Sequence, residues 1–443
     1  MKKYDNYKDS GIEWLGEIPE NWEMWKISHA FKRIGSGTTP ESGNPLYHEN
    51  GTINWLNTGD LNDGILNSCN KKVTAKALED FSSLKIFPAG SLVMAMYGAT
   101  IGKTSIINFD TTTNQACCVF CKGEIIDVKF LQYWFIGNKE HIINLAIGGG
   151  QPNISQNILK DVRVSCPNFN EQQLIANYLD HKTTQIDTLI AKKEQFISLL
   201  QEERTAVINQ AVTKGLDPKV KMKDSGIEWL GEIPEHWEVA KFNLYVSIRH
   251  GHQFMNHDFT DDGVKVVKIT QLHKDGYLDL SKCSYVSSEQ LENYQSILIK
   301  EKDILMCLTG GTIGKIIRVG EVNEPLLQNY RVGHFSSGKA SKISDDFIFW
   351  LMSSESIVSQ IFFQMRETGQ PNIGMDDFGR MRITIPPLME QEKIVKHIVN
   401  KTVEISEILI KSKQEIELLK EYKTALISEV VTGKVDVRDV ILN

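Results

Sequence analysis

One stretch of the sequence resembles a phosphate-binding loop. In MAMYGATIGKTS, residues 94–105, an expected strand runs into Gly98, Gly102 and Lys103. A phosphate-binding loop needs four residues between its glycines so that backbone N–H groups can surround the phosphates, whereas three stand here. The related stretch GGTIGKII, residues 310–317, also lacks the Ser or Thr that would hold Mg²⁺. We therefore expect a turn between two strands rather than a nucleotide site.

Other patterns that could do chemistry are incomplete. Cys118 and Cys121 have the spacing of half a zinc site, but no second Cys/His pair stands at a suitable distance. Residues 127–129 and 217–219 carry the D-x-K tripeptide of nuclease cores without a convincing upstream carboxylate. Residues 385–388 lack the leading Asp or Asn and the aromatic residue of a base-methylating motif, and we find no nucleophile elbow. The sequence predicts a chain with no catalytic residues and no metal.

Polar loops favour DNA binding instead, because Arg, Lys, Asn, Gln, Ser and Thr side chains reach phosphates and base edges. A single residue of this kind is more often ordinary loop surface, so the prediction rests on the whole set. In the first half of the chain the candidates are Arg33, Ser36, Thr38, Thr39, Asn57, Thr58, Lys71, Lys72, Gln151 and Asn153. In the second half they are Arg249, His250, His252, Gln253, Lys268, Gln271, His273, Lys274, Arg366, Gln370 and Asn372.

The composition argues partly against a DNA-binding chain. The 443 residues suffice for two to four domains, but the net charge of −7 is not that of a typical nucleic-acid binder. A local basic groove, or partners that neutralise phosphates, would reconcile the two observations. No apolar run approaches the roughly 20 residues of a membrane span, and the seven cysteines are odd in number and scattered. We expect a cytoplasmic chain with reduced thiols.

The second half of the sequence repeats the plan of the first. KDSGIEWLGEIPENWE, residues 8–23, returns at 223–238 with one difference in sixteen positions. The landmarks TIGK and GQPNI also occur twice, and the second favours a structural turn at Gln151, Asn153, Gln370 and Asn372. Between these landmarks the copies differ widely. Each copy is expected to form an α+β domain, about 26–167 and 241–387, and duplication predicts approximate twofold symmetry.

A long amphipathic helix is expected after each domain, at 171–213 and 390–432, with a capping box from Asn170 and Gln173 at the first. Apolar residues recur every three to four positions, which predicts a pairing seam between the two helices. At about 1.5 Å per residue each helix would be about 65 Å long, suited to a spacer. The predicted seam residues are Ile175, Leu179, Ile186, Leu189, Phe196, Leu200, Val207, Ile394, Ile398, Ile405, Ile408, Leu419, Tyr422 and Leu426.

The order and duplication of GIEWLGEIPExW, TIGK, QPNI and PxxxEQ resemble the specificity subunits of Type I restriction–modification enzymes over essentially the whole chain. The resemblance implies an α+β fold with two pseudo-twofold-related target-recognition domains, separated by two long helices packed as an antiparallel coiled coil. Each domain would read one half of a bipartite double-stranded DNA target, and the helices would set the gap. The implied domains are 1–167 and 216–387 for recognition, with 168–215 and 388–443 as spacer helices.

The resemblance also implies partners. Two modification (methyltransferase) subunits would carry S-adenosylmethionine, and restriction subunits would use ATP and Mg²⁺, so no cofactor is expected in this chain. One departure concerns the pair Asn114-Gln115, because the second copy has Gln328-Asn329 in reversed order. That position is therefore expected to be structural rather than DNA-contacting. A self-contained nuclease or nucleotide hydrolase, and an interaction scaffold with no DNA role, remain the alternatives.

Overall fold

The computed structural model describes residues 2–146, 153–273, 276–338, 342–368 and 372–441, with only the backbone for 366–368. The chain forms two compact units. Unit 1 comprises Met1–Glu194 with Lys413–Asn443, and unit 2 comprises Gln195–Ser412. Within the described ranges, none of the helices has both the length and the apolar character needed to cross a membrane.

Unit 1 is built on two sheets, one with the strand order β4-β11-β8-β9-β6 and one with the order β10-β5-β7. The pairs β4/β11, β11/β8 and β8/β9 are antiparallel, whereas β6/β9 and β5/β10 are parallel. The strands are β4 (Ile34–Gly35), β5 (Ile53–Leu56), β6 (Ile65–Leu66), β7 (Lys72–Val73), β8 (Leu92–Ala95), β9 (Thr104–Ile107), β10 (Thr112–Thr113) and β11 (Cys117–Phe120).

Shorter elements complete unit 1. Two-stranded sheets join β1 (Tyr7–Asp9) to β2 (Glu17–Pro19) and β3 (Glu23–Lys26) to β12 (Arg163–Cys166). The helices are α1 (Ile27–Ala30), α2 (Pro45–His48), the 3-10 helix η1 (Thr58–Asp60), α3 (Ala75–Asp80), α4 (Val128–Gly137), α5 (Lys139–Ile143) and α6 (Gln156–Asp161). Residues 128–143 thus form two consecutive helices, α4 and α5.

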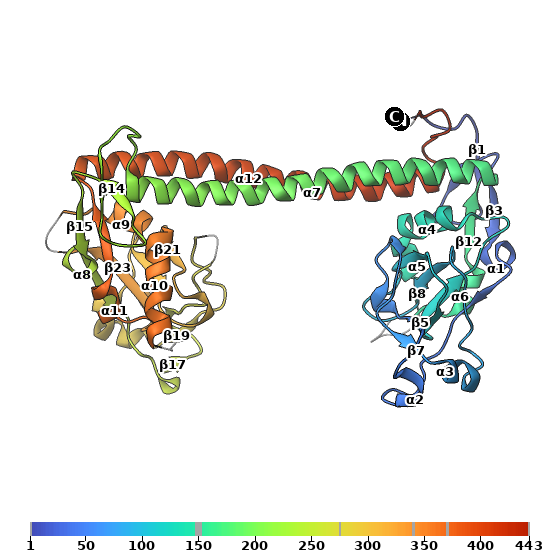
Figure 1. The fold of residues 1–443 in the computed structure, drawn as a ribbon, viewed down its shortest axis with the longest axis horizontal. Coiled ribbons are helices and arrows are strands. Elements are labelled where there is room, and N and C mark those ends of the chain that lie inside the picture. The colour runs from blue at the N-terminus through green and yellow to red at the C-terminus, as the bar shows by residue number, and fades with distance from the viewer. Residues whose placement is uncertain (1, 147–152, 274–275, 339–341, 369–371, 442–443) are drawn as a thin grey trace. The chain divides into compact units, whose positions relative to one another are not determined.

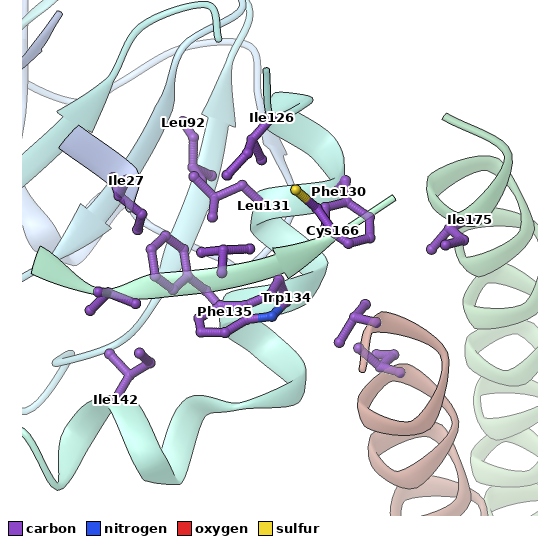
Figure 2. Close-up of a cluster of buried hydrophobic side chains, with 14 of the residues drawn as sticks. Ile27, Leu92, Ile126, Phe130, Leu131, Trp134, Phe135, Ile142, Cys166 and Ile175 are labelled. Carbon is purple, nitrogen blue, oxygen red and sulfur yellow. The ribbon is translucent and has the colours of Figure 1, made fainter. Parts of the chain in front are cut away.

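The core of unit 1 lies between its larger sheet, α4 and the long helices. Figure 2 shows Phe130, Leu131, Trp134 and Phe135 of α4 gathered with Leu92 of β8, and each of the five is fully buried. Asp127 starts α4 by accepting hydrogen bonds from the backbone N–H groups of Lys129 and Phe130. Burial of several aromatic side chains on one helix gives this layer most of its apolar contact area.

Unit 2 repeats this plan in its own two sheets, with the orders β16-β23-β20-β21 and β17-β19-β18-β22. The strands are β13 (Met222–Asp224), β14 (Glu232–Pro234), β15 (Glu238–Lys241), β16 (Val246–His250), β17 (Phe259–Thr260), β18 (Val264–Val267), β19 (Ser284–Val286), β20 (Ile304–Cys307), β21 (Ile316–Arg318), β22 (Leu326–Gln328), β23 (Val332–Ser337) and β24 (Arg382–Ile385). The helices are α8 (Phe242–Tyr245), η2 (Asn256–Asp258), η3 (Ser288–Ile297), η4 (Gly310–Thr312), α9 (Asp345–Met352), α10 (Glu355–Thr368) and α11 (Met375–Arg380).

The long helices are α7 (Phe169–Lys214) and α12 (Leu388–Val431), close to the expected ranges. In each unit the segments of α7 and α12 that belong to it lie side by side (Figure 1). In unit 1 Lys193 pairs with Glu415 at 2.5 Å and Asp187 pairs with Lys423 at 2.7 Å, so these segments run antiparallel. In unit 2 Leu200 packs with Ile405 and Leu409.

The start of α7 differs from the expected capping box. Asn168, rather than Asn170, accepts a hydrogen bond from the backbone N–H of Glu171 through Oδ1 at 3.1 Å, and Phe169 is already helical. The expectation placed the cap two residues too late, because Asn168 and Asn170 are both suitable cap residues and only the backbone geometry distinguishes them.

Most of the predicted seam residues are buried, but four are not. Leu189, Phe196, Ile408 and Tyr422 are 43%, 45%, 41% and 47% exposed and do not line the seam. The error is one of register: the prediction steps three residues from Ile186, whereas the helix of 3.6 residues per turn brings the residue four positions on, Ile190, against the core. The buried seam positions are Ile175, Leu179, Ile186, Leu200, Ile394, Ile398, Ile405 and Leu426, with Val207 and Leu419 half-buried.

We expect Ile186→Ala to lower the free energy of unfolding of unit 1 by about 2–5 kcal/mol, because Ile186 is buried and its removal leaves a cavity. The matched change Leu189→Ala, three residues along the same helix, removes an exposed side chain and should cost less than about 1 kcal/mol. Thermal and chemical denaturation of the two variants measure the difference. Equal losses would contradict the observed register.

Candidate functional site

Close backbone packing defines the same site in both units. A Cβ at Gly37 would lie 1.8 Å from the carbonyl oxygen of Thr113, and a Cβ at Gly251 would lie 1.9 Å from that of Gln328. Only glycine permits this approach. Gly37 follows β4 and Gly251 follows β16, so these glycines occupy equivalent positions beside the ends of β10 and β22.

A turn with an asparagine follows each of those strands. The backbone N–H of Asn114 donates to Leu56 O at 3.1 Å, and its Oδ1 accepts from the N–H of Ala116 at 3.2 Å. In unit 2 the N–H of Asn329 donates to Val267 O at 3.0 Å, and its Oδ1 accepts from the N–H of Arg331 at 3.3 Å. Asn114 therefore corresponds to Asn329. The pairs Asn114-Gln115 and Gln328-Asn329 are not equivalent positions, because Gln328 corresponds to Thr113, one residue before Asn114.

A third segment closes the site. Tyr97 and Asn153 form an isolated β-bridge in unit 1, and Thr309 and Asn372 form the corresponding bridge in unit 2. Next to them, the N–H of Ile154 donates to Met96 O at 2.8 Å, and that of Ile373 donates to Leu308 O at 2.9 Å. The repeated Asn-Ile pair is thus a structural connection that places one exposed asparagine beside each site. Gln151 and Gln370, which precede it, lie outside the described residues.

In unit 1 several predicted residues meet around this frame. Thr39 Oγ1 donates to Gln115 Oε1 at 2.5 Å, and Trp55 Nε1 donates to the carbonyl oxygen of Thr38 at 3.1 Å. Asn57 accepts from Asn114 Nδ2 at 3.2 Å and donates to Trp55 O at 3.0 Å. The half-buried side chains of Thr38, Thr39 and Asn57 therefore come together at the carboxyl ends of β5 and β10.

The other predicted residues of unit 1 are spread more widely. Lys71 Nζ lies 5.8 Å from the centre of the Trp55 ring, beside the site, and Lys72 is exposed in β7 opposite Asn54. Ser36, between β4 and Gly37, and Thr58, at the start of η1, are half-buried.

Arg33 has a structural role that the loop sequence did not indicate. Its Nη2 donates to Ile86 O at 2.7 Å, and its guanidinium lies 4.6 Å from the centre of the Phe87 ring. Its backbone oxygen accepts from Cys121, at the end of β11 away from the Asn114 turn. Arg33 is therefore held apart from the other candidates of unit 1, and its contact with DNA stays a prediction from sequence.

In unit 2 Arg249 is used inside the fold. Its guanidinium donates to Gln328 Oε1 at 3.1 Å and to Ser296 O at 3.0 Å, and it lies 3.8 Å from Asp303. Burial lowers the pKa of Arg249, and the charge of Asp303 opposes that shift. The guanidinium therefore supports the frame of unit 2, and its contact with DNA stays a prediction from sequence.

The His250-to-Gln253 loop occupies the same place as Ser36 to Thr39. His250 Nδ1 lies 3.2 Å from Tyr330 O, and the His252 ring lies 5.1 Å from that of Tyr294. His252 and Gln253 are exposed. This loop thus presents aromatic and amide groups where the first unit presents hydroxyls.

Lys268 corresponds to Asn57, because each follows the strand next to the asparagine turn. Its Nζ donates to Ser284 Oγ at 2.7 Å and lies 3.9 Å from the centre of the Phe259 ring. Burial lowers its pKa. Gln271, in contrast, is 4% exposed, accepts from the Lys268 N–H and donates to Lys282 O, so its expected DNA contact is corrected to a structural role.

His273 stacks on Tyr277 with ring centres 4.4 Å apart, and its ring is half-buried. The remaining predictions cannot be placed: Lys274 and the side chain of Arg366 lie outside the described residues. The residues that sequence reasoning did not select are Tyr97, Gln115, Tyr330 and Arg331. The asparagine shared by the two copies could have identified them. It was overlooked because Asn114-Gln115 was aligned with Gln328-Asn329, one residue out of register.

The patterns that suggested other chemistry have structural explanations. Residues 98–103 connect β8 to β9 in an antiparallel pair, which confirms the expected turn between strands. Cys118 is fully buried in β11, and this burial raises the pKa of its thiol. In the part of the chain that the structure describes, no three His, Cys, Asp or Glu side chains are grouped so as to hold a metal ion.

Comparisons with known proteins agree with this duplicated site. A family model described as the Type I restriction modification DNA specificity domain matches residues 19–198 and again 234–418. The MjaVIII specificity subunit of a Type I restriction enzyme from Methanocaldococcus jannaschii is 27% identical over 442 residues, which cover 99% of this chain and 97% of that one.

Solved structures share the fold. One is described as the structural basis underlying complex assembly and conformational transition of the type I R-M system. It has a TM-score of 0.71 at 10% identity, covering 94% of this chain and 99% of the other. The HsdS subunit from Thermoanaerobacter tengcongensis has a TM-score of 0.57 at 12% identity, covering 94% and 98%.

We expect Gly37→Ala to destabilise unit 1 by about 1–3 kcal/mol or more, because the new Cβ would overlap the Thr113 carbonyl and separate β4 from β10. Gly59→Ala is the matched control, since a Cβ there meets nothing within 4 Å. Thermal unfolding of the purified variants measures both. A Gly37→Ala protein as stable as Gly59→Ala would show that the close approach is not required.

Proposed function

Because the chain belongs to the family of Type I restriction–modification specificity subunits, we propose that each of its two target recognition domains reads one half of a bipartite double-stranded DNA sequence. The chain is a Type I specificity subunit with two target recognition domains.

The observation that carries the proposal is that the two units share a backbone frame, made by the glycine contact and the asparagine turn, but present different side chains around it. Gly37 and Gly251 make the same backbone contact, and Asn114 and Asn329 make the same turn. At matched positions around that frame the side chains differ, for example Thr38 against His252. Selection for a common fold explains the shared frame, and recognition of two different base sequences explains the differences at its surface.

Eleven of the predicted residues remain proposed DNA contacts, and their position in or beside the two glycine–asparagine frames supports this proposal. In unit 1 they are Ser36, Thr38, Thr39, Asn57, Lys71 and Asn153, and in unit 2 they are His250, His252, Gln253, Lys268 and Asn372. Thr58, Lys72 and His273 are proposed contacts at the margins. Gln151, Lys274, Arg366 and Gln370 stay predictions from sequence alone.

The two long helices are proposed to set the number of base pairs between the half-sites. Each helix is continuous from one unit into the other, and in each unit it is held to its partner by a buried apolar seam. A paired helix is stiffer than a flexible linker of the same length, so it can transmit a fixed spacing and rotation. The domain division 1–167, 168–215, 216–387 and 388–443 is proposed on the same grounds.

The chain is proposed to be non-catalytic and to act in the cytoplasm with other subunits. Two modification subunits would supply S-adenosylmethionine and adenine methylation, and restriction subunits would supply ATP-dependent cleavage. The net charge of −7 supports shared DNA binding, because such partners can neutralise phosphates that this chain does not. If the assembled complex did not bind DNA, or bound it with an affinity that did not depend on salt concentration, an interaction scaffold with no DNA role would be favoured instead.

Exchanging residues 26–167 for the corresponding domain of another family member should change one half of the methylated sequence and leave the other half and the gap unchanged. The measurement is single-molecule sequencing of adenine methylation in DNA modified by the complex, with and without this chain. Exchange of residues 241–387 is the matched control and should change the opposite half. A change in both halves, or in neither, would contradict modular reading.

Lengthening the helix pair should alter the gap alone. Four residues inserted before Lys192 in α7, with four between Ile416 and Glu417 in α12, turn the helices by about 40° beyond a full turn. One base pair turns DNA by about 35°, so we expect the gap to grow by about one base pair with both half-sites retained. The control inserts four residues in the exposed loop at Asp261–Gly263. An unchanged gap in the helix variant would refute the spacer role.

A further inference from the structure

The turn that follows each shared asparagine carries different side chains on the same backbone. The carbonyl oxygens of Ala116 and Arg331 accept from equivalent N–H groups, Met96 at 2.8 Å and Leu308 at 3.0 Å. Ala116 therefore corresponds to Arg331, and Gln115 corresponds to Tyr330. Gln115 and Arg331 are exposed, although both are anchored by neighbours in the site. Each unit thus projects one held polar side chain from the same turn.

Gln115 is held by a neighbour but retains hydrogen-bonding capacity. Its Oε1 accepts from Thr39 Oγ1 at 2.5 Å. Burial raises the pKa of Tyr97, and the nearby Gln115 side chain opposes that shift. A glutamine amide has two acceptor lone pairs and two N–H donors, so an acceptor lone pair and an N–H donor remain for a ligand. That pair matches the N6 and N7 edge of adenine.

Arg331 is held by its own neighbour. Its Nε donates to the Tyr330 hydroxyl at 2.6 Å, and its guanidinium carbon lies 5.2 Å from the centre of the Tyr330 ring. Among the described residues its two terminal nitrogens have no hydrogen-bond partner. A guanidinium fixed through Nε presents those two nitrogens side by side, which matches the O6 and N7 acceptors of guanine.

Contact with the phosphate backbone is the competing explanation. Phosphate contacts carry no sequence information, so a turn that served only to bind phosphate would gain nothing from different side chains in the two units. Here the backbone is the same, but Gln115 and Ala116 of unit 1 correspond to Tyr330 and Arg331 of unit 2, so the turn presents an amide in one unit and a guanidinium, one position further along, in the other. Both are groups that pair in bidentate fashion with a single purine.

We propose that Gln115 reads an adenine in the half-site of unit 1 and that Arg331, positioned by Tyr330, reads a guanine in the half-site of unit 2. This inference rests on the proposed function, because it assumes that each unit reads one half of a split target. It adds which side chain specifies one base in each half.

The test is the methylated sequence made by the assembled complex, read by single-molecule sequencing on a library with every base varied in both halves. Gln115→Ala should lower the preference for adenine at one position of the first half by about 10- to 100-fold, with the second half unchanged. Arg331→Ala should do the same for guanine at one position of the second half. Asn108 and Lys300 are exposed polar residues that lie at the ends of β9 and β20 remote from the two sites. As controls, Asn108→Ala and Lys300→Ala should change neither half.

Two further variants keep the turn filled and predict an altered base. Gln115→Glu has the same shape but accepts only, so the preferred base should change from adenine to cytosine, whose N4 amino group donates. Arg331→Gln should change guanine to adenine at its position. These outcomes require a folded, assembled complex, so they cannot arise from loss of structure.

The results separate this inference from the function on which it rests. A uniform fall in methylation with all preferences kept would indicate phosphate contact and overturn it, as would unchanged preferences or a change in the wrong half. A second half without any G·C pair would overturn the assignment of Arg331. In each of these cases a split target from the unaltered complex still supports the proposed function, whereas no split target would reject both.

Discussion

A buried glutamine at the start of each long helix joins the helix to the domain before it. Gln172 and Gln391 are both fully buried. Gln172 Nε2 donates to Pro167 O at 2.8 Å and Ile125 O at 2.9 Å, and its Oε1 accepts from the N–H of Asp127, the cap of α4. Gln391 makes the same three bonds, to Pro386, Lys342 and Ser344, the cap of α9. A buried amide is tolerated only when its donors and acceptor are paired, so each bond depends on the others.

The consequence is a helix that leaves each domain at a defined point, whatever the surface loops contain. The segment that precedes each domain adds to this constraint. In unit 1 Glu171 accepts from Trp22 Nε1 at 3.2 Å and from the Tyr4 hydroxyl at 2.8 Å. In unit 2 Glu390 pairs at 2.8 Å with His236, the one residue that differs between the repeated segments 8–23 and 223–238. The attachment of each helix to its domain is thus independent of the surface loops. The loops of a specificity subunit can therefore differ between the two domains while both domains are joined to their helices in the same way. The sites at Asn114 and Asn329 lie in that divergent part.

Much of the plan was predictable from the sequence, and the failures have physical reasons. The strand that precedes Gly98 and the approximate bounds of α7 and α12 follow from local patterns, which hydrophobic period and turn residues reveal. The seam failed at Leu189 and Phe196 because a three-residue and a four-residue step are equally apolar there, and only packing chooses between them. The structural contacts of Arg33, Arg249 and Gln271 could not be predicted, because their partners are backbone groups remote in sequence, such as those of Ile86, Ser296 and Lys282.

The sequence by itself determined the duplicated architecture, the family and the recognition function, because repeats and their order survive in the chain without any knowledge of contacts. The tertiary structure alone decided which polar side chains remain available at each site. It paired Asn114 with Asn329 and so brought Gln115 and Arg331 into view, since the equivalence lies in hydrogen bonds to Leu56 and Val267 rather than in matching letters. A side chain's freedom to bind depends on what surrounds it, and those surroundings come from segments that only folding brings together.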